Sequence, residues 1–153
     1  MMKLIAHRGL LNGPDKDLEN KPETIRHAWE SGFDCEVDLW KIDDKWFLGH
    51  DEPTYETSIL FLFNDKTWIH CKNFEALNFL SSHRHTNFNF FWHQKDDFTL
   101  TSSGHLWTYP SKELEKNSIC VLPENYMDLS DINTLQCMGI CSDYVNDIRN
   151  YLK

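Results

Sequence analysis

Short apolar segments alternate with polar, turn-rich segments along the chain. The apolar segments are rich in Ile, Val, Phe, Trp and Cys and are bounded by Gly, Asn, Asp or Pro, a pattern typical of buried β-strands. The pattern predicts eight main strands: Leu4–Ala6, Cys35–Leu39, Thr67–Cys71, Phe88–Trp92, Phe98–Leu100, Leu106–Tyr109, Ile119–Leu122 and Gly139–Cys141.

Helical signals separate several of these strands. Pro22 suits the first position of a helix that Gly32 would end, and Asn73 can cap a helix over Phe74–Leu80. Strands that alternate with helices indicate an α/β fold with a mostly parallel sheet. Three further helical segments are expected: Lys112–Lys116, Asp131–Met138 and Tyr144–Leu152.

The number of strands favours a closed barrel of the (β/α)8 TIM type, formed by residues 1–153 as a single domain. Such barrels usually take roughly 250 residues, and Phe98–Leu100 is too close to Leu106–Tyr109 for a helix between them. We therefore expect a compact, pared-down (β/α)8 barrel in which loops replace some of the helices. An open, doubly wound α/β sheet is the alternative fold.

The composition indicates a folded domain and excludes several classes of partner. Of the 153 residues, 41% are hydrophobic and 14% are aromatic, which is enough to fill a core. The net charge of −9 disfavours binding to nucleic acid and to anionic membrane surfaces. The longest apolar run, Ile59–Phe63, is far shorter than the roughly 20 residues of a membrane helix, so we expect no membrane insertion.

The cysteines and the N-terminal segment bear on the expected location. The first apolar run is too short for the core of a signal peptide. Five cysteines, an odd number without a secretion signal, indicate reduced thiols. The expected location is therefore the cytoplasm.

Residues that can carry chemistry cluster at the ends of the predicted strands, where α/β sheets place their sites. Glu36 and Asp38 are two residues apart in one strand, so their side chains share a face and start about 7 Å apart. Two negative charges at that distance repel by about 2.5 kcal/mol at an effective dielectric constant of ~20, and a divalent cation or a lysine would relieve this repulsion. His70 and Lys72 have the same spacing on the next strand. The residues between them are expected to face the helices: Cys35, Val37, Ile69 and Cys71.

The first third of the chain carries a series of short motifs in a characteristic order. They are His7-Arg8-Gly9, Glu19-Asn20, Gly32 followed by Glu36-Val37-Asp38, and Gly49-His50-Asp51. The series resembles that of the glycerophosphodiester phosphodiesterase family, within the phospholipase-C-like phosphodiesterases, and it covers the first 51 residues. The resemblance implies a (β/α) barrel and a metal-dependent phosphodiesterase that hydrolyses a small, glycerophosphodiester-like alcohol phosphodiester.

The resemblance also implies roles for the matched residues. His7 and His50 are expected to be the general base and acid, and Glu36 and Asp38 to be ligands of a divalent metal ion, Mg²⁺ or Ca²⁺. His70 stands where the family has a third ligand, a glutamate, and an imidazole there shifts the preference toward Mn²⁺ or Zn²⁺. The expected substrate- and phosphate-binding residues are Arg8, Lys72, Glu19, Asn20 and, because it ends the fourth main strand, His93.

Phosphodiester hydrolysis needs the chemistry that these residue types offer. Positive charge must neutralise the non-bridging oxygens, a base must activate the nucleophile, and an acid must protonate the leaving alkoxide. Two other interpretations remain open: a non-catalytic barrel of the same family that binds a phosphate or polar ligand, and an unrelated α/β sugar-phosphate enzyme in which His50 and Glu36 share no site. Three aromatic residues are expected to pack in the core or on the surface rather than to line a sugar or lipid pocket: Trp92, Trp107 and Tyr109.

Overall fold

The structure, a computed structural model, describes residues 2–83 and 86–153. All its strands belong to one sheet, and the described helices are short. The strands are β1 (Lys3–Ala6), β2 (Asp34–Ile42), β3 (Lys45–Leu48), β4 (Tyr55–Thr57), β5 (Thr67–Cys71), β6 (Asn89–Phe91), β7 (Phe98–Leu100), β8 (Leu106–Thr108), β9 (Ser118–Val121) and β10 (Gly139–Ser142). The α-helices are α1 (Pro22–Glu30), α2 (Phe74–Ser82) and α3 (Val145–Tyr151), and the 3₁₀ helices are η1 (His7–Gly9), η3 (Pro123–Asn125) and η4 (Leu129–Thr134).

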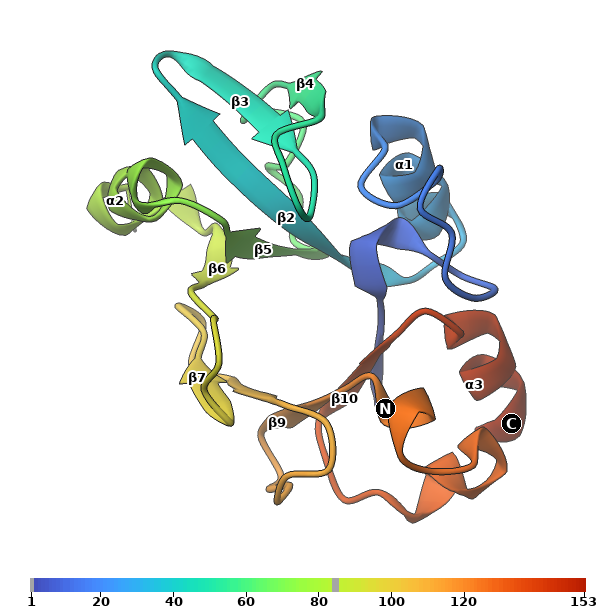
Figure 1. The fold of residues 1–153 in the computed structure, drawn as a ribbon. Helices are drawn as coiled ribbons and strands as arrows, with labels where there is room; N and C mark the ends of the chain where they lie inside the picture. Colours follow the sequence, from blue (N-terminus) through green and yellow to red (C-terminus); the bar gives the residue numbers. More distant parts are fainter. Residues whose placement is uncertain (1, 84–85) are drawn as a thin grey trace.

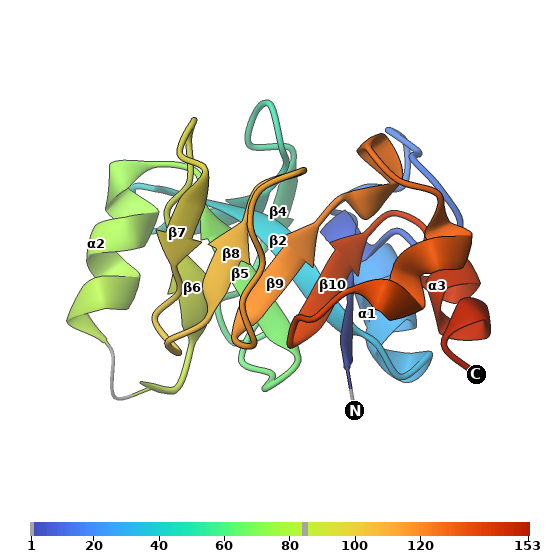
Figure 2. The same ribbon diagram turned by 90° about the horizontal axis from the view of Figure 1, so that it is seen from below.

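Seven strands form the parallel part of the sheet, in the order β6–β5–β2–β1–β10–β9–β8. β3 pairs antiparallel with the C-terminal half of β2, and β4 pairs antiparallel with β3. β7 pairs antiparallel with β8. Figure 1 shows the sheet curling round a central region, with α1, α2 and α3 on its outer side. Figure 2 shows the parallel strands side by side, so their C-terminal ends meet at one rim.

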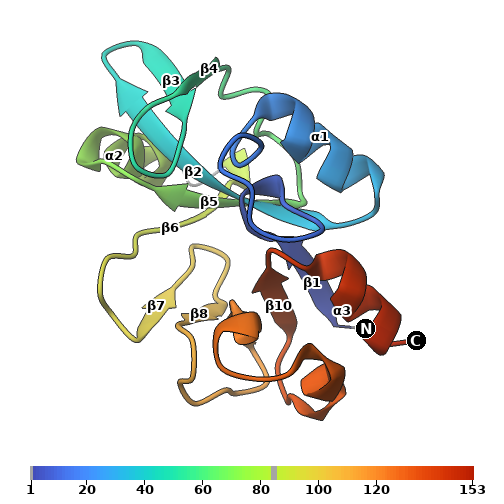
Figure 3. The same ribbon diagram turned by 45° about the vertical axis from the view of Figure 1, so that its right-hand side comes forward.

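The prediction of a (β/α)8 TIM-type barrel is wrong, because the structure is a mixed sheet curled into a half-barrel with few helices. Only three α-helices occur in the described residues, and the longest has nine residues. No ladder joins β6 to β7 among the described residues; β6 is linked instead to the turn after β7 by isolated hydrogen bonds such as that from the Ser102 N–H to the Phe90 carbonyl (2.8 Å). A parallel crossover needs a dozen or more residues, and the segment from β7 to β8 is a hairpin. The doubly wound alternative does not hold either, since the α-helices lie on the same side of the sheet (Figure 3).

The eight predicted strands are present, whereas the predicted helices are confirmed only in part. Asn73 caps α2 by accepting a hydrogen bond from the Ala76 N–H, and α1 begins at Pro22. Lys112–Lys116 forms no helix. The segment expected as an α-helix after Ser130 is instead the 3₁₀ helix η4, which Asp128 caps. No described helix has the length and apolar character that crossing a bilayer requires.

The two faces of the sheet bury different sets of side chains. The outward residues of β2 and β5 pack beneath the helices as predicted: Cys35, Val37, Ile69 and Cys71 lie in one cluster with Ile25 and Ala28 of α1 and Ala76 and Leu80 of α2. Inside the curl, Phe91 and Trp107 stack with ring centroids 4.5 Å apart, and Trp68 lies 5.8 Å from Trp107. Because His70 follows Trp68 by two residues on β5, it lies on the same face as this aromatic layer, one step nearer the C-terminal rim.

Four of the five cysteines should be unreactive in the native protein. Burial raises the pKa of Cys71 to about 12 and that of Cys120 to about 11, and it raises the pKa of Cys35 and Cys141 well above the usual range. Since only the thiolate reacts, we expect a disulfide reagent such as Ellman's reagent to label at most Cys137, which is half-buried, at pH 8. All five thiols should react after denaturation. Rapid labelling of two or more thiols in the native protein would contradict this burial.

Candidate active site

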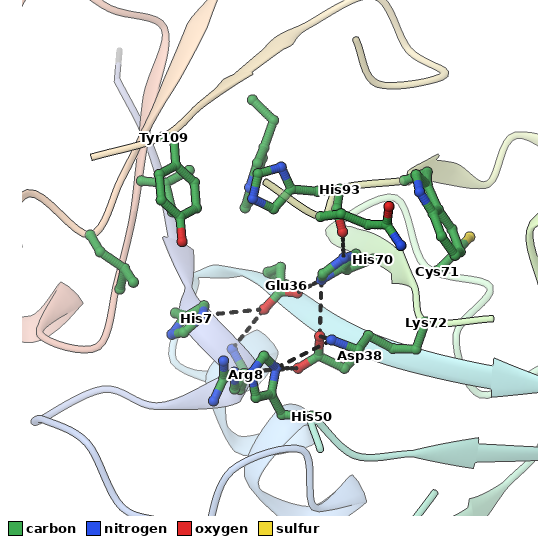
Figure 4. Close-up of a pocket in the computed structure, with 15 residues that line it drawn as sticks. His7, Arg8, Glu36, Asp38, His50, His70, Cys71, Lys72, His93 and Tyr109 are labelled. Carbon is green, nitrogen blue, oxygen red and sulfur yellow. Dashed lines mark hydrogen bonds and ion pairs between the residues drawn. The ribbon is translucent and has the colours of Figure 1, made fainter. Parts of the chain in front are cut away.

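A cavity of about 410 Å³ opens at the C-terminal rim of the parallel strands (Figure 4). Its lining comes from the strand ends and from the loops that follow them, as α/β sheets arrange their sites. Two of the ten predicted site residues, Glu19 and Asn20, lie outside it. The other eight line the cavity: His7, Arg8, Glu36, Asp38, His50, His70, Lys72 and His93.

Two buried carboxylates form the base of the cavity. Glu36 and Asp38 of β2 are 2% and 1% exposed, and they share a face as the spacing predicts. Burial and the neighbouring charge of Asp38 raise the pKa of Glu36. Burial alone would raise the pKa of Asp38 too, but its contacts with the His50 and His70 rings and the charge of Arg8 hold that pKa well below its usual range. The site thus keeps Asp38 as a carboxylate by surrounding it with donors.

Asn20 and Glu19 hold the cavity residues from behind. The Asn20 amide donates to Asp38 Oδ2 at 2.9 Å and accepts from the Asp38 backbone N–H at 2.9 Å, with Asn20 fully buried. Glu19 accepts from Arg8 Nη1 at 2.8 Å. Both residues therefore position other residues of the site, and neither lines the cavity, unlike the binding role expected for them.

Replacing Asn20 with alanine should destabilise the fold and disturb Asp38. Asn20 has φ 61°, so a control must account for the left-handed backbone. Asn87 is exposed and has φ 59°, which makes Asn87→Ala the matched variant. We expect Asn20→Ala to lower the free energy of unfolding by about 2 kcal/mol more than Asn87→Ala, measured by urea denaturation, because a buried ionised partner loses its hydrogen bond. Equal losses in the two variants would mean that the side-chain hydrogen bonds of Asn20 add nothing to stability and that only its backbone conformation matters.

His70 has the geometry of a metal ligand. Its Nε2–H donates to the His93 carbonyl at 3.0 Å, which leaves Nδ1 to face Asp38 Oδ1 at 3.0 Å and Glu36 Oε1 at 3.9 Å. Two such acceptor atoms repel unless a hydrogen or a cation lies between them. Ligand atoms about 2.1 Å from a common ion lie roughly 3 to 4 Å apart, and one ligand atom from each of these three residues lies within 4.8 Å of the others. A backbone acceptor for the second nitrogen is typical of metal-bound histidines, so the three residues fit a divalent cation.

His7 is oriented by a residue that the sequence analysis missed. His7 Nδ1 lies 2.8 Å from Asp143 Oδ1, and its Nε2 lies 4.0 Å from Glu36 Oε2. Burial opposes the charged ring, but the hydrogen bond with Asp143 and the charge of Glu36 outweigh it and raise the pKa of His7. Asp143 is itself held by Glu124, which accepts from its backbone N–H at 2.9 Å. Asp143 directly follows β10, so the rule that strand ends carry the site could have found it.

Two cationic side chains line the cavity, one after β1 and one after β5. Arg8 follows β1 with φ 53°, and its backbone N–H donates to Glu36 Oε2 at 3.2 Å. Burial opposes its charge, but Asp38 and Glu36 outweigh that effect and raise the pKa of Arg8. Lys72 Nζ lies 3.6 Å from Asp38 Oδ1 and 3.5 Å from His50 Nδ1. Both cations thus lie next to the Asp38 carboxylate in the lining of the cavity.

His50 is presented by a tight turn after β3. Gly49 has φ 153°, and a Cβ there would lie 2.0 Å from the Glu52 carbonyl oxygen, so only glycine fits. The Trp40 indole donates to the Gly49 carbonyl at 2.7 Å and fixes the turn. His50 Nδ1 consequently lies 3.4 Å from Asp38 Oδ2, while the ring keeps 35% of its side-chain surface exposed. Because His50 and Glu36 line one cavity, the structure argues against the interpretation in which they share no site.

An aromatic wall faces the carboxylates across the cavity. The ring of His93 lies 4.9 Å from that of Tyr109, and Trp92 and Trp107 also line the space. Trp92, Trp107 and Tyr109 were expected only to pack in the core or on the surface. That expectation is incomplete, since all three line the cavity.

No protein-family model, no curated protein and no solved structure matches this chain. Only the chemistry of the cavity and the motifs of the first 51 residues therefore bear on its function.

Proposed function

We propose that this protein is a metal-dependent phosphodiesterase that hydrolyses a small alcohol phosphodiester. One observation carries the proposal. The Nδ1 atom of His70 faces two buried carboxylates while its other nitrogen is anchored to a backbone carbonyl, and two cations and two further histidines surround this group. The likeness of the His7, Glu36 and His50 motifs to glycerophosphodiester phosphodiesterases supports a glycerophosphodiester-like substrate.

Glu36, Asp38 and His70 would hold the cation. When bound, a divalent cation supplies positive charge that stabilises the negative charge developing on the phosphoryl oxygens. The imidazole ligand favours Mn²⁺ or Zn²⁺ over Mg²⁺ or Ca²⁺, because nitrogen ligands suit transition metals better than hard oxygen-loving ions.

The other residues of the cavity would bind the phosphate and move protons. Arg8 and Lys72 add charge that draws an anionic diester into an otherwise acidic protein. His7, anchored by Asp143 through Nδ1, would accept at Nε2 the proton of the attacking water molecule or hydroxyl group. His50, the more exposed ring, would donate a proton to the departing alkoxide.

The proposal is tested by turnover of a nitrophenyl phosphodiester and of a glycerophosphodiester after chelation and addition of single metals. Activity is expected with Mn²⁺ or Zn²⁺ and should be lost on chelation and in Asp38→Asn. Glu56→Gln alters only an exposed ion pair with Lys45 and serves as the control that keeps its activity. Binding of a phosphodiester without turnover under any metal would instead support the non-catalytic interpretation.

A further inference from the structure

The ring of His93 carries a polar atom that has no hydrogen-bond partner in the wall of the cavity. His93 Nε2 is buried and makes no hydrogen bond within the described parts of the chain, although the ring lines the cavity and only 10% of its side-chain surface is exposed. An unpaired buried nitrogen costs free energy. Such a cost at a cavity wall indicates that a ligand atom completes the hydrogen bond.

The partner of the other ring nitrogen decides what kind of ligand atom this is. His93 Nδ1 lies 2.8 Å from Asp96 Oδ2. Burial slightly opposes the charge of Asp96, but hydrogen bonds from His93 and from the Gln94 backbone outweigh it and lower the pKa of this carboxyl group. Asp96 is therefore an acceptor at neutral pH, and Nδ1 carries the hydrogen.

Asp96 occupies Nδ1, so Nε2 is the ring nitrogen left to meet a ligand. A hydroxyl group both donates and accepts, so it can pair with Nε2 whether or not that nitrogen carries a hydrogen. The non-bridging oxygens of a phosphodiester only accept. The geometry therefore favours the alcohol side of the substrate for His93 over the phosphate-binding group that its sequence position predicted.

The surroundings of His93 suit the carbon skeleton of such an alcohol. The Tyr109 ring lies 4.9 Å from the His93 ring, and Trp107 forms part of the same cavity surface. Aromatic faces pack against C–H groups, while the unpaired Nε2 of His93 can form a hydrogen bond with a hydroxyl group. A polyhydroxy alcohol presents both features at once.

We propose that His93, oriented by Asp96, is a specificity-determining residue that recognises a free hydroxyl of the substrate alcohol. This inference rests on the proposed function, since it concerns the alcohol of the same phosphodiester. It implies that the protein prefers polyhydroxy phosphodiesters to alkyl phosphodiesters of the same length.

Two symmetric substrates test the preference without ambiguity about which alcohol occupies which side. They are bis(2,3-dihydroxypropyl) phosphate and dipropyl phosphate, which differ only in their hydroxyl groups. The wild-type protein should show a kcat/KM ratio of about tenfold or more in favour of the dihydroxypropyl ester. In His93→Phe, which keeps a ring beside Tyr109 but has no acceptor, the ratio should fall to about 1.

Three further variants serve as controls. His93→Gln retains an acceptor near the position of Nε2 and should recover part of the ratio. His105→Phe is the matched control outside the cavity, because His105 packs on Trp68 and contacts Ser103, and its ratio should equal that of the wild type. His93→Ala replaces His93→Phe if the larger ring prevents folding.

A ratio near 1 in the wild-type protein, or a ratio that His93→Phe leaves intact, overturns the inference and leaves the phosphodiesterase proposal standing. If no diester is hydrolysed, the phosphodiesterase proposal fails by itself, and calorimetry with glycerol 1-phosphate and propyl phosphate then decides the role of His93. Tighter binding of glycerol 1-phosphate that disappears in His93→Phe supports hydroxyl recognition. Equal binding of the two monoesters refutes it.

Discussion

Replacing His7 with alanine is expected to lower kcat by roughly 10²–10⁴-fold, the usual contribution of a general base. The ring sits between Asp143 and Glu36 with Nε2 toward the cavity, so its loss removes the proton acceptor. The expected loss is similar for an alkyl and a nitrophenyl diester. The His7 side chain contacts Asp143 and Glu36 and belongs to none of the buried hydrophobic clusters, so thermal unfolding should show that the variant still folds.

His50→Ala separates the acid from the base. A nitrophenolate leaves without protonation, so this variant should lose far less activity on the nitrophenyl ester than on an alkyl diester. Equal losses on both esters would remove the assigned role of His50. A larger loss for His7→Ala on the alkyl ester alone would exchange the two roles.

The pH dependence of turnover gives an independent measure of the pKa of His7. The base must be neutral, so the rising limb of the pH–rate profile follows the pKa of His7, which Asp143 and Glu36 raise against the effect of burial. Asp143→Asn removes a negative charge and should lower that pKa, which moves the rising limb to lower pH. An unchanged limb would mean that His7 is not the group that titrates there.

Metal binding should produce the second large effect. Mn²⁺ or Zn²⁺ at 100 times its dissociation constant should stabilise the protein by about 2.7 kcal/mol, seen as a higher melting temperature that a chelator reverses. Asp38→Asn should abolish the shift, because this carboxylate contacts His70 directly. His70→Glu should turn the preference toward Mg²⁺ or Ca²⁺, since it replaces the nitrogen ligand with oxygen.

Glu56→Gln removes one partner of an exposed ion pair with Lys45 and controls for general effects of removing a negative charge. This variant should keep the full metal-induced shift of the melting temperature. One outcome would show that Glu36, Asp38 and His70 do not bind a metal ion. If a chelator leaves the melting temperature unchanged and Asp38→Asn raises it in buffer that contains metal, the carboxylates form only ion pairs with the neighbouring cations: Arg8 and Lys72.

The strands and the faces of their side chains follow from the sequence, because they depend on local patterns. The period-two spacing of Glu36 and Asp38 and of His70 and Lys72 places each pair on one side of a strand. In the pairing of β2 with β5, Asp38 is opposite His70, and this register brings together the three residues proposed to bind a metal ion: Glu36, Asp38 and His70. The burial of Cys35 and Cys71 on the other face follows from the same alternation.

The closure of the sheet and the positioning residues depend on contacts between distant segments, which no local pattern contains. Only the folded chain shows that β7 turns back on β8 and that the curl stays a half-barrel. His7 and Asp143 are 136 residues apart, yet they meet because β1 pairs with β10. Local spacing thus determined which side chains face the site, whereas the order of the strands decided which of them touch.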